Sequence, residues 1–557
     1  MTKEIQDNVI ASKTTKAEGL SRRRFMQGAV VLGAAAIAGT LAACDTEPSD
    51  QEPEKESEPE DVGDGTGIEW DRETEIVIVG YGGAGAVSAI CATDAKAKLI
   101  VLEKQAKDVE GQPWTQTNNT RICYSAVMNF NSVAEARAYL KAVSRGRTPD
   151  DVIESWAKYA VSTVDFLQSL GGDPVDAGCT TEYPKDILPE AFDTYHQWAF
   201  RNQGPELWET LDKGCKSRDV EVLFETPGKQ LLRNSDGVII GVKAEQNGKD
   251  FYVKATKAVV LATAGFEYNE VMLQQFVWAN PCRFYASPAS TGDGVKMAQE
   301  VGADLWNMSL IGGRVIPYFP ELGFGLMGGT PSPGILVNKY GKRFMRENWK
   351  SHSAVWESFK FSTDLGDFPA VPCFSVFDHS AYTRGPVISA TGSMLKTGQY
   401  KWSDDNNAEL AKGWILKGDT IEELASVIAR DPDVGARMKP EVLAETLSTY
   451  NTNAAAGNDP EFGRYGNSLQ TLDTPPYYAL KMYPGGVNTF GGPKRNGKSQ
   501  IVDVHGKAIP HLYGAGEMGS VLGFLYSGGG WNICEIITSG HIVAENAILE
   551  TAWTDLA

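Results

Sequence analysis

Short apolar runs, separated by small or polar residues, divide most of this chain into candidate strands and helices. Residues 75–79 (EIVIV) form an apolar, β-branched run typical of a buried parallel strand. The glycine-rich segment 80–85 (GYGGAG) follows, and then AVSAICATDA, which has helical character. A second apolar run, residues 98–102, ends at Glu103. The order strand, glycine turn, helix and strand predicts a βαβ unit of an α/β fold.

The glycines of this turn point to a dinucleotide. Gly80 permits the tight turn, Gly82 lets a pyrophosphate approach the backbone, and Gly85 lets helix and strand pack closely. The helix amino terminus offers unpaired N–H groups to the anion. Glu103 is placed to accept hydrogen bonds from the ribose hydroxyls. The motif alone does not separate FAD from NAD.

The amino-terminal segment has the pattern of an export signal. Residues 21–27 (SRRRFMQ) fit the twin-arginine pattern, and the apolar stretch 28–43 is too short for a comfortable transmembrane helix. It runs into Cys44 through LAAC, which resembles the lipobox of bacterial lipoproteins. We expect 1–43 to be a signal peptide and the mature protein to lie, anchored by a lipid on Cys44, at the outer face of the cytoplasmic membrane. An uncleaved anchor, or ordinary cleavage beside an incidental cysteine, is the alternative.

The next segment is acidic and has no apolar face. Residues 45–67 are nearly all acidic, Pro, Ser or Gly, so we expect 44–71 to be a disordered tether. Much of the formal net charge of −19 resides there. Because nucleic acid requires a basic protein face, this charge argues against a nucleic-acid partner.

The eight cysteines are scattered singly, with no CxxC or CxxCH spacing. This makes a disulfide framework, a zinc ribbon or a locally coded iron–sulfur site a poor prediction, and we predict no metal site. Whether scattered cysteines converge on an iron–sulfur cluster stays open at this point.

Four later segments carry a family resemblance. They are 257–266 (KAVVLATAGF), 291–298 (TGDGVKMA), 512–517 (LYGAGE) and 528–533 (GGGWNI). In this order they resemble the FAD-dependent oxidoreductases of the fumarate reductase, succinate dehydrogenase and 3-ketosteroid dehydrogenase superfamily. The resemblance implies an α/β fold, with a Rossmann-like FAD-binding domain built from both ends of the chain and an inserted α+β capping domain.

The resemblance also places the domains and the cofactor. We expect the FAD-binding domain at 72–308 and 488–557, the capping and substrate domain at 309–487, and non-covalent FAD. The cofactor-binding residues it implies, together with the glycine motif, are Gly80, Gly82, Gly83, Ala84, Gly85, Glu103, Lys104, Gly111, Gln112, Thr115, Thr117, Val222, Thr263, Gly265, Asp293, Glu517, Gly529, Gly530, Asn532 and Ile533.

Three positions depart from the fumarate reductase pattern, and each has a neutral residue where that family has a basic one. Ser351 aligns with the catalytic arginine of that family, and Asn488 stands where it has a histidine. Tyr526 and Ser527 occupy the place of its substrate-binding arginine. Without these charges a dicarboxylate lacks bidentate partners, so we expect a bulky, largely neutral substrate.

The expected reaction is reduction of an activated C=C bond, in which flavin N5 supplies a hydride and a side chain supplies a proton. Tyr526, Lys350 and His352 are the candidate proton donors, and Ser351 and Asn488 complete the predicted catalytic set. A lone histidine is more often structural, and a lysine needs desolvation to donate near neutral pH.

We predict an exported, respiratory-type FAD-dependent reductase of a steroid-like enone or unsaturated lactone, of the kind that acts on cardiac glycosides or urocanate. No second nucleotide fold appears, so direct use of NADH is not indicated, and an exported flavoprotein cannot reach the cytoplasmic NADH pool. A membrane cytochrome or a quinol-linked partner is therefore the expected electron donor. The alternatives are a ketosteroid-type dehydrogenase working in the oxidative direction, a reductase of an unsaturated carboxylic acid, and a lipid-anchored binding protein with structural FAD.

Overall fold

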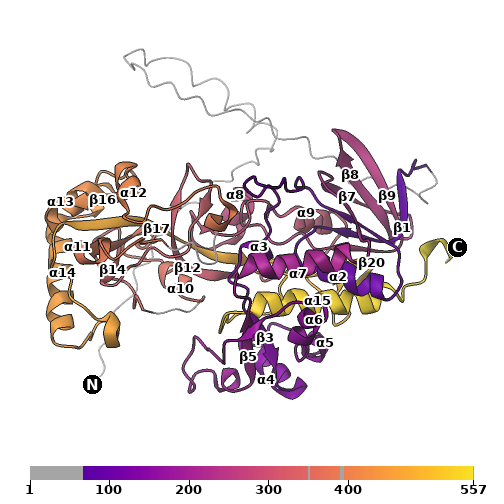
Figure 1. Cartoon of the computed structure of the whole chain (residues 1–557), viewed down its shortest axis with the longest axis horizontal. Coiled ribbons are helices and arrows are strands. Elements are labelled where there is room, and N and C mark those ends of the chain that lie inside the picture. Colours follow the sequence, from indigo (N-terminus) through magenta and orange to yellow (C-terminus); the bar gives the residue numbers. More distant parts are fainter. Residues whose placement is uncertain (1–66, 349–351, 389–393, 556–557) are drawn as a thin grey trace, which may run out of the picture. The chain divides into compact units, whose positions relative to one another are not determined.

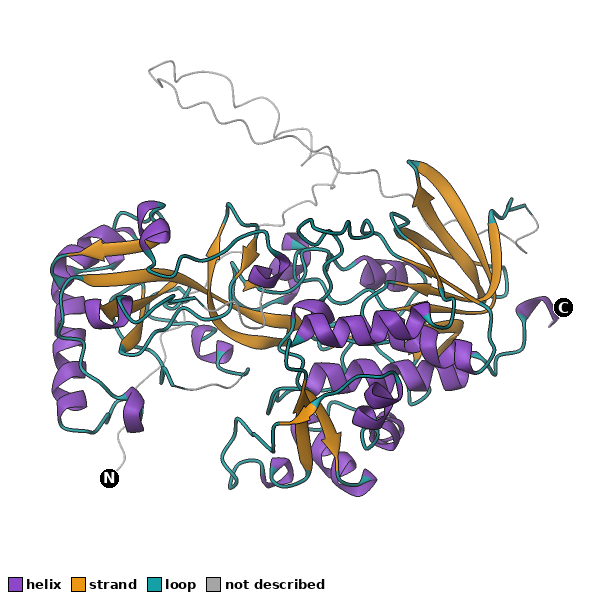
Figure 2. Ribbon diagram, in the orientation of Figure 1, coloured by secondary structure: helices purple, strands orange, loops and turns teal. Residues whose placement is uncertain are grey.

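Two large β-sheets organise the computed structural model, which describes residues 67–348, 352–388 and 394–555 (Figures 1 and 2). The first sheet has eight strands, with the path β19-β20-β9-β1-β2-β6 and the pair β7 and β8 attached at β9. Their bounds are β1 (Arg72–Val79), β2 (Leu99–Leu102), β6 (Glu221–Leu223), β7 (Gly228–Arg233), β8 (Ile239–Gln246), β9 (Lys249–Leu261), β19 (Gln500–Val502) and β20 (Ala508–Gly514).

The centre of this sheet is parallel and draws on both ends of the chain. β1 runs parallel to β2 and β9, and β20 runs parallel to β9, with Val77 beside both Ile100 and Val259. These core residues are fully or nearly fully buried, which explains why the strands are continuous apolar runs. The α/β class predicted from the sequence is confirmed.

The helices α2 (Gly83–Asp94), α7 (Gly204–Lys216) and α15 (Trp531–Ala547) pack together beside this sheet (Figure 1). The contact between α2 and α15 depends on glycine. A Cβ on Gly83 would lie 2.2 Å from Cδ1 of Ile536, and one on Gly540 would lie 2.6 Å from Cγ1 of Val87. Small residues therefore let the carboxyl-terminal helix lie directly against the helix of the glycine motif.

The second sheet has seven strands: β10 (Arg283–Phe284), β12 (Ile311–Phe319), β13 (Phe324–Gly325), β14 (Gly334–Asn338), β15 (Cys373–Asp378), β16 (Ile415–Gly418) and β17 (Tyr477–Thr489). The long strand β17 pairs with β12, β15, β16 and β10. Because β10 precedes residue 309 and β17 continues to Thr489, this sheet takes residues from both sides of the predicted domain boundaries.

The remaining elements cover the sheets or form small ones. β3, β5 and β4 make a three-stranded sheet, and β11 pairs with β18. Their bounds, with those of the other α-helices, are α3 (Asn119–Ile122), β3 (Val127–Phe130), α4 (Val133–Ser144), α5 (Asp150–Tyr159), α6 (Thr163–Ser169), β4 (Val175–Asp176), β5 (Tyr195–Ala199), α8 (Glu270–Phe276), α9 (Asp293–Glu300), β11 (Leu305–Trp306), α10 (Val355–Ser358), α11 (His379–Tyr382), α12 (Asn407–Ala411), α13 (Ile421–Ile428), α14 (Pro440–Ala455) and β18 (Gly492–Pro493).

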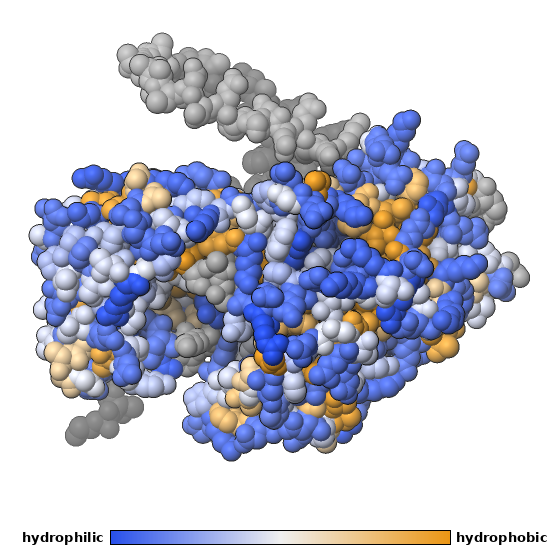
Figure 3. Space-filling model, viewed as in Figure 1, coloured by the Kyte–Doolittle hydropathy of each residue, from blue (hydrophilic) through white to orange (hydrophobic). Residues whose placement is uncertain are grey.

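Hydrophilic side chains dominate the face drawn in Figure 3, with apolar residues gathered in separate patches. Within the described ranges, no helix of the protein has the length and apolar character needed to cross a bilayer. The predicted signal peptide, Cys44 and the tether as far as residue 66 lie outside the described residues. The last five residues of the predicted tether, 67–71, are described, and Asp71 exchanges two hydrogen bonds with the backbone of Tyr252.

A buried ion pair fastens α15 to the turn that precedes it. Nη2 of Arg495 lies 2.9 Å from Oε1 of Glu535, and both side chains are only 1% exposed. The carboxylate also accepts a hydrogen bond from the backbone N–H of Val521. Arg495 in turn donates to three backbone carbonyl groups, those of Gly514, Gly516 and Gly519. Burial raises the pKa of Glu535 above its usual value, and the neighbouring guanidinium of Arg495 offsets only part of this rise.

We expect Glu535→Gln to destabilise the protein strongly, because it leaves a buried guanidinium without its counter-charge at a cost of about 3–5 kcal/mol. Glu545→Gln on the same helix is the matched control, since its pair with Lys158 is half exposed and worth at most about 1 kcal/mol. Thermal unfolding followed by tryptophan fluorescence measures both. Equal midpoints for the two variants would contradict the assignment.

Candidate active site

A cavity of about 600 Å³ opens at the carboxyl ends of the parallel strands. Val79 and Leu102 end β1 and β2 and line it, as do Ala262 and Ala515, which directly follow β9 and β20. This edge of an open α/β sheet is where ligands bind, and the volume is that of a cofactor or small-molecule site.

The glycine turn borders the cavity without side chains. Gly80 has φ +106°, and a Cβ there would lie 2.4 Å from the carbonyl oxygen of Ala262. A Cβ on Gly85 would lie 2.0 Å from the carbonyl oxygen of Gly80, so this glycine serves helix packing. A Cβ on Gly82 would have Cβ of Asn118 as its nearest neighbour, at 3.9 Å, so there is open space for a ligand beside this glycine.

Charged side chains mark one end of the cavity. Glu103 is buried and accepts hydrogen bonds from the backbone N–H groups of Tyr81 and Gln105, both at 2.8 Å. Nζ of Lys104 lies 2.7 Å from both Thr291 Oγ1 and Asp293 Oδ2. The lysine is therefore neutralised by a partner inside the site, and Glu103 keeps carboxylate lone pairs for further donors.

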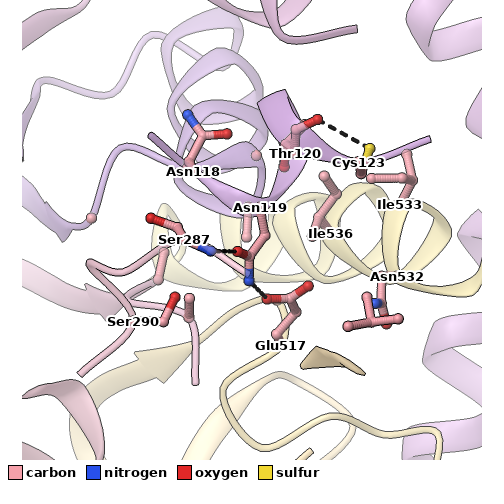
Figure 4. Close-up of a pocket in the computed structure, with 18 of the residues that line it drawn as sticks. Asn118, Asn119, Thr120, Cys123, Ser287, Ser290, Glu517, Asn532, Ile533 and Ile536 are labelled. Atoms are coloured by element: carbon pink, nitrogen blue, oxygen red, sulfur yellow. Dashed lines mark hydrogen bonds between the residues drawn. The ribbon is translucent and has the colours of Figure 1, made fainter. Parts of the chain in front are cut away.

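A chain of hydrogen bonds joins three residues that line the cavity (Figure 4). Asn119 accepts from the backbone N–H of Ser287 at 2.7 Å and donates through Nδ2 to Oε2 of Glu517 at 2.7 Å. Burial and the nearby carboxyl group of Glu267 raise the pKa of Glu517 to about 8. Glu517 is therefore protonated at neutral pH and can donate a hydrogen bond into the site.

The other end combines aromatic and ionisable groups. The rings of His352 and Tyr526 stack, with centroids 4.3 Å apart and planes 24° apart. Glu182 lies 2.5 Å from Nδ1 of His352, and Nη2 of Arg314 lies 3.5 Å from Nε2. Burial raises the pKa of Tyr526 well above 10, so its hydroxyl stays protonated and acts as a donor. Tyr285 also lines this end.

Sixteen of the residues singled out from the sequence line this cavity. They are Gly80, Gly82, Gly83, Ala84, Glu103, Lys104, Thr117, Thr263, Asp293, Glu517, Gly529, Gly530, Asn532, Ile533, His352 and Tyr526. Their positions in the chain extend from the end of β1 to the start of α15, so the fold gathers them from both termini.

The structure places the other predicted residues elsewhere. Gly111, Gln112 and Thr115 lie in an exposed loop, where Asp108 accepts from the backbone N–H of Thr115. Val222 pairs with Val101 on β6, the terminal strand of the sheet path. Two further predicted residues, Gly85 and Gly265, serve close packing, and a Cβ on Gly265 would meet Oγ1 of Thr489 at 2.1 Å. Lys350 and Ser351 lie outside the described residues.

Asn488 is fully buried and is not among the cavity-lining residues. Its Oδ1 accepts a hydrogen bond from Nδ2 of Asn532 at 2.9 Å, and its own Nδ2 donates to the carbonyl oxygen of Thr489. The side chain therefore positions Asn532, which does line the cavity, instead of touching a substrate.

The donor set fits FAD. Among the described residues, Nδ2 of Asn118 and Oδ1 of Asn532 are buried in the cavity wall without a hydrogen-bond partner. Buried polar atoms of this kind require a partner, which a bound cofactor provides. With the open space at Gly82 and the amino terminus of α2, they form a site suited to a dinucleotide.

Sequence reasoning missed several lining residues, among them Gln105, Asn118, Asn119, Glu182, Tyr285, Ser287, Ser290 and Arg314. Most lie in loops with no recognisable motif. Arg314 corrects part of the sequence interpretation, because a guanidinium does reach the cavity, although from β12 and not from the three positions compared above. The signal available in the sequence was a single charged residue, Arg314, inside an otherwise apolar strand.

Known proteins resemble this chain along most of its length. The model of the FAD binding domain family matches residues 75–533. Digoxin reductase of Eggerthella lenta is 27% identical, over 96% of this chain and 98% of that protein. Fumarate reductase (cytochrome) of Shewanella frigidimarina is 26% identical, over 85% of this chain and 76% of that protein.

A solved structure shares the fold. The crystal structure of 3-ketosteroid Δ1-dehydrogenase from Sterolibacterium denitrificans, in complex with 1,4-androstadiene-3,17-dione, matches with a TM-score of 0.72. The match covers 86% of this chain and 99% of that chain at 19% identity. At this identity the likeness shows the architecture alone.

The raised pKa of Glu517 predicts a pH effect on stability. The unfolded chain loses this proton near pH 4.3, whereas the folded protein holds it to about pH 8. Stability therefore falls as pH rises through this interval, because deprotonation favours the unfolded state. We expect Glu517→Gln to reduce the fall in thermal midpoint between pH 5 and 8. Exposed Glu110→Gln is the control, and a profile for Glu517→Gln that parallels the wild type would refute the prediction.

Proposed function

This chain belongs to the FAD binding domain family, and we propose that it is an exported reductase. Its proposed substrate is a bulky, largely neutral enone or unsaturated lactone, in which it reduces an activated C=C bond. The predicted superfamily is confirmed: the chain is an FAD-dependent oxidoreductase acting on CH–CH bonds, and its substrate is a small molecule. When bound, FAD supplies the hydride for such a reduction.

The charge balance at the aromatic end of the cavity carries the substrate proposal. Among the described lining residues the permanently cationic side chains are Lys104 and Arg314, and Lys104 is paired with Asp293. Arg314 shares its end of the cavity with the carboxylate of Glu182. Because Glu182 offsets the charge of a protonated His352, a dicarboxylate would meet one guanidinium without a second cationic partner, whereas a single carbonyl oxygen needs only one donor.

Aromatic side chains support a flat, bulky substrate. The stacked pair of His352 and Tyr526 lines this end of the cavity together with Tyr285. Digoxin, which gives one relative its name, is a neutral steroid glycoside with an unsaturated lactone. Arg314 or the protonated hydroxyl of Tyr526 would donate to the carbonyl oxygen and polarise the conjugated bond.

Arg314 also favours a second candidate, an unsaturated monocarboxylic acid, because one guanidinium can bind one carboxylate bidentately.

The electron donor we propose is a membrane cytochrome or a quinol-linked protein at the outer face of the cytoplasmic membrane. The name of the Shewanella relative, fumarate reductase (cytochrome), supports such a donor.

An anaerobic reoxidation assay tests the function. FAD-loaded protein is reduced with dithionite, and the return of flavin absorbance is followed with digoxin, a 3-ketosteroid enone, cinnamate or fumarate. We expect the neutral acceptors to react at least about 10-fold faster than fumarate. Reoxidation no faster than in buffer by every acceptor would refute the reductase, and a strong preference for cinnamate would select the second candidate.

Arg314→Met should slow reoxidation by the preferred acceptor about 10- to 100-fold, the loss of a charge-assisted hydrogen bond of about 1.5–3 kcal/mol. Arg283→Met is the matched control, because Arg283 pairs with Glu270 and does not line the cavity. Equal losses in both variants would show that the effect is structural.

The localisation is tested at the amino terminus. Replacing both Arg22 and Arg23 by Lys should retain the precursor in the cytoplasm of a host with twin-arginine transport. Cys44→Ser should abolish incorporation of labelled palmitate and release the exported protein from the membrane fraction. Export of the double variant, or labelling of the Cys44→Ser protein, would contradict the proposed anchor.

A further inference from the structure

Two contacts join Glu182 to His352. The backbone N–H and the Nδ1 atom of His352 each lie 2.5 Å from one oxygen of the Glu182 carboxylate. Both side chains are largely buried, at 16% and 12% exposed. Glu182 is held in turn by its own backbone N–H, which donates to the carbonyl oxygen of Ser527 at 2.7 Å. The carboxylate is therefore fixed from its backbone before it orients the imidazole.

This contact decides which ring nitrogen remains available. A carboxylate accepts hydrogen bonds, so Nδ1 of His352 carries a proton and donates it to Glu182. Nε2 is then the nitrogen on the opposite side, 3.5 Å from Nη2 of Arg314, the outer limit of a hydrogen bond. Because a guanidinium only donates, Nε2 accepts from Arg314 once it has given up its own proton. Tyr526 stacks on the ring and prevents it from turning away from the cavity.

We propose that His352 is the proton donor of the reaction, acting through Nε2, and that Glu182 is the positioning residue that orients its ring and stabilises the charged imidazolium. The inference rests on the proposed reductase function. As the π bond of the conjugated alkene breaks, one carbon would take a hydride, which is the chemistry that bound, reduced FAD would supply. Its neighbour takes the proton from Nε2, which leaves a neutral imidazole that solvent reprotonates.

Other groups at this end suit different roles. Tyr526 is buried beside the Glu182 carboxylate and Tyr285, and a phenolate there would be strongly disfavoured, so its hydroxyl donates a hydrogen bond without giving up its proton. Arg314 keeps its charge under all ordinary conditions and suits the substrate carbonyl. Of the side-chain types at this end, imidazole is the one that commonly serves as a general acid.

Single-turnover reoxidation separates the two roles. With the fastest acceptor, His352→Gln should lower the maximal rate about 100- to 10,000-fold, the usual contribution of a general acid, with the acceptor dissociation constant nearly unchanged. Glu182→Gln should lower the same rate about 10- to 100-fold. The controls are His196→Gln and Asp176→Asn, a histidine–carboxylate pair with Nδ1 to Oδ2 at 2.9 Å that does not line the cavity.

A second readout reports orientation without activity. The chain contains six histidines, so nitrogen-15 spectra of histidine-labelled, FAD-loaded protein can be assigned with the His352→Gln variant. In the wild type we expect the neutral His352 to be the Nδ1–H tautomer, and in Glu182→Gln a mixture of tautomers. Flavin absorbance confirms that each variant retains FAD.

The outcomes distinguish two failures. If no acceptor reoxidises the wild type, the reductase function fails and this proposal fails with it. If the wild type reacts and His352→Gln keeps more than half of its maximal rate, only the present proposal is overturned. An Nε2–H tautomer in the wild type, or an unchanged tautomer in Glu182→Gln, overturns the role of Glu182.

Discussion

The close contact of α15 with α2 is the constraint on which the site depends. Gly83 and Gly540 remove the side chains that would keep these helices apart, and the buried pair of Arg495 and Glu535 fastens the preceding turn to α15. Because of this contact, residues from the last part of the chain share one cavity wall with the turn that follows β1. Tyr526 reaches the cavity for the same reason.

The cavity contains two carboxyl groups whose surroundings give them different chemistry. Burial and the neighbouring Glu267 raise the pKa of Glu517, although the hydrogen bond that it accepts from Asn119 lowers it, and Glu517 is therefore a neutral donor. Glu182 contacts a histidine through both oxygens and acts as an acceptor. The two carboxyl groups therefore offer a donor beside Asn119 and an acceptor beside His352 within one cavity.

Local patterns predicted the parts of the site that local geometry creates. The tight turn at Gly80, the packing at Gly85 and the acid at Glu103 each follow from a short stretch of sequence, and the structure has all three geometries. Prediction was weaker where a family position was transferred without its surroundings. Gln112 lies in an exposed loop, and Asn488 points into the core toward Asn532, because the backbone conformation around each residue decides its direction.

The sequence by itself determined the βαβ unit and the α/β class, because hydrophobic periodicity and glycine spacing are local properties of the chain. The choice of FAD came from the resemblance of four later segments to known flavoproteins. Only the tertiary structure decided that Glu182, Arg314 and His352 meet beside Tyr526. These residues come from a loop, a strand of the second sheet and a segment far along the chain. Their contact depends on long-range packing, which places a carboxylate and a guanidinium on opposite sides of one imidazole.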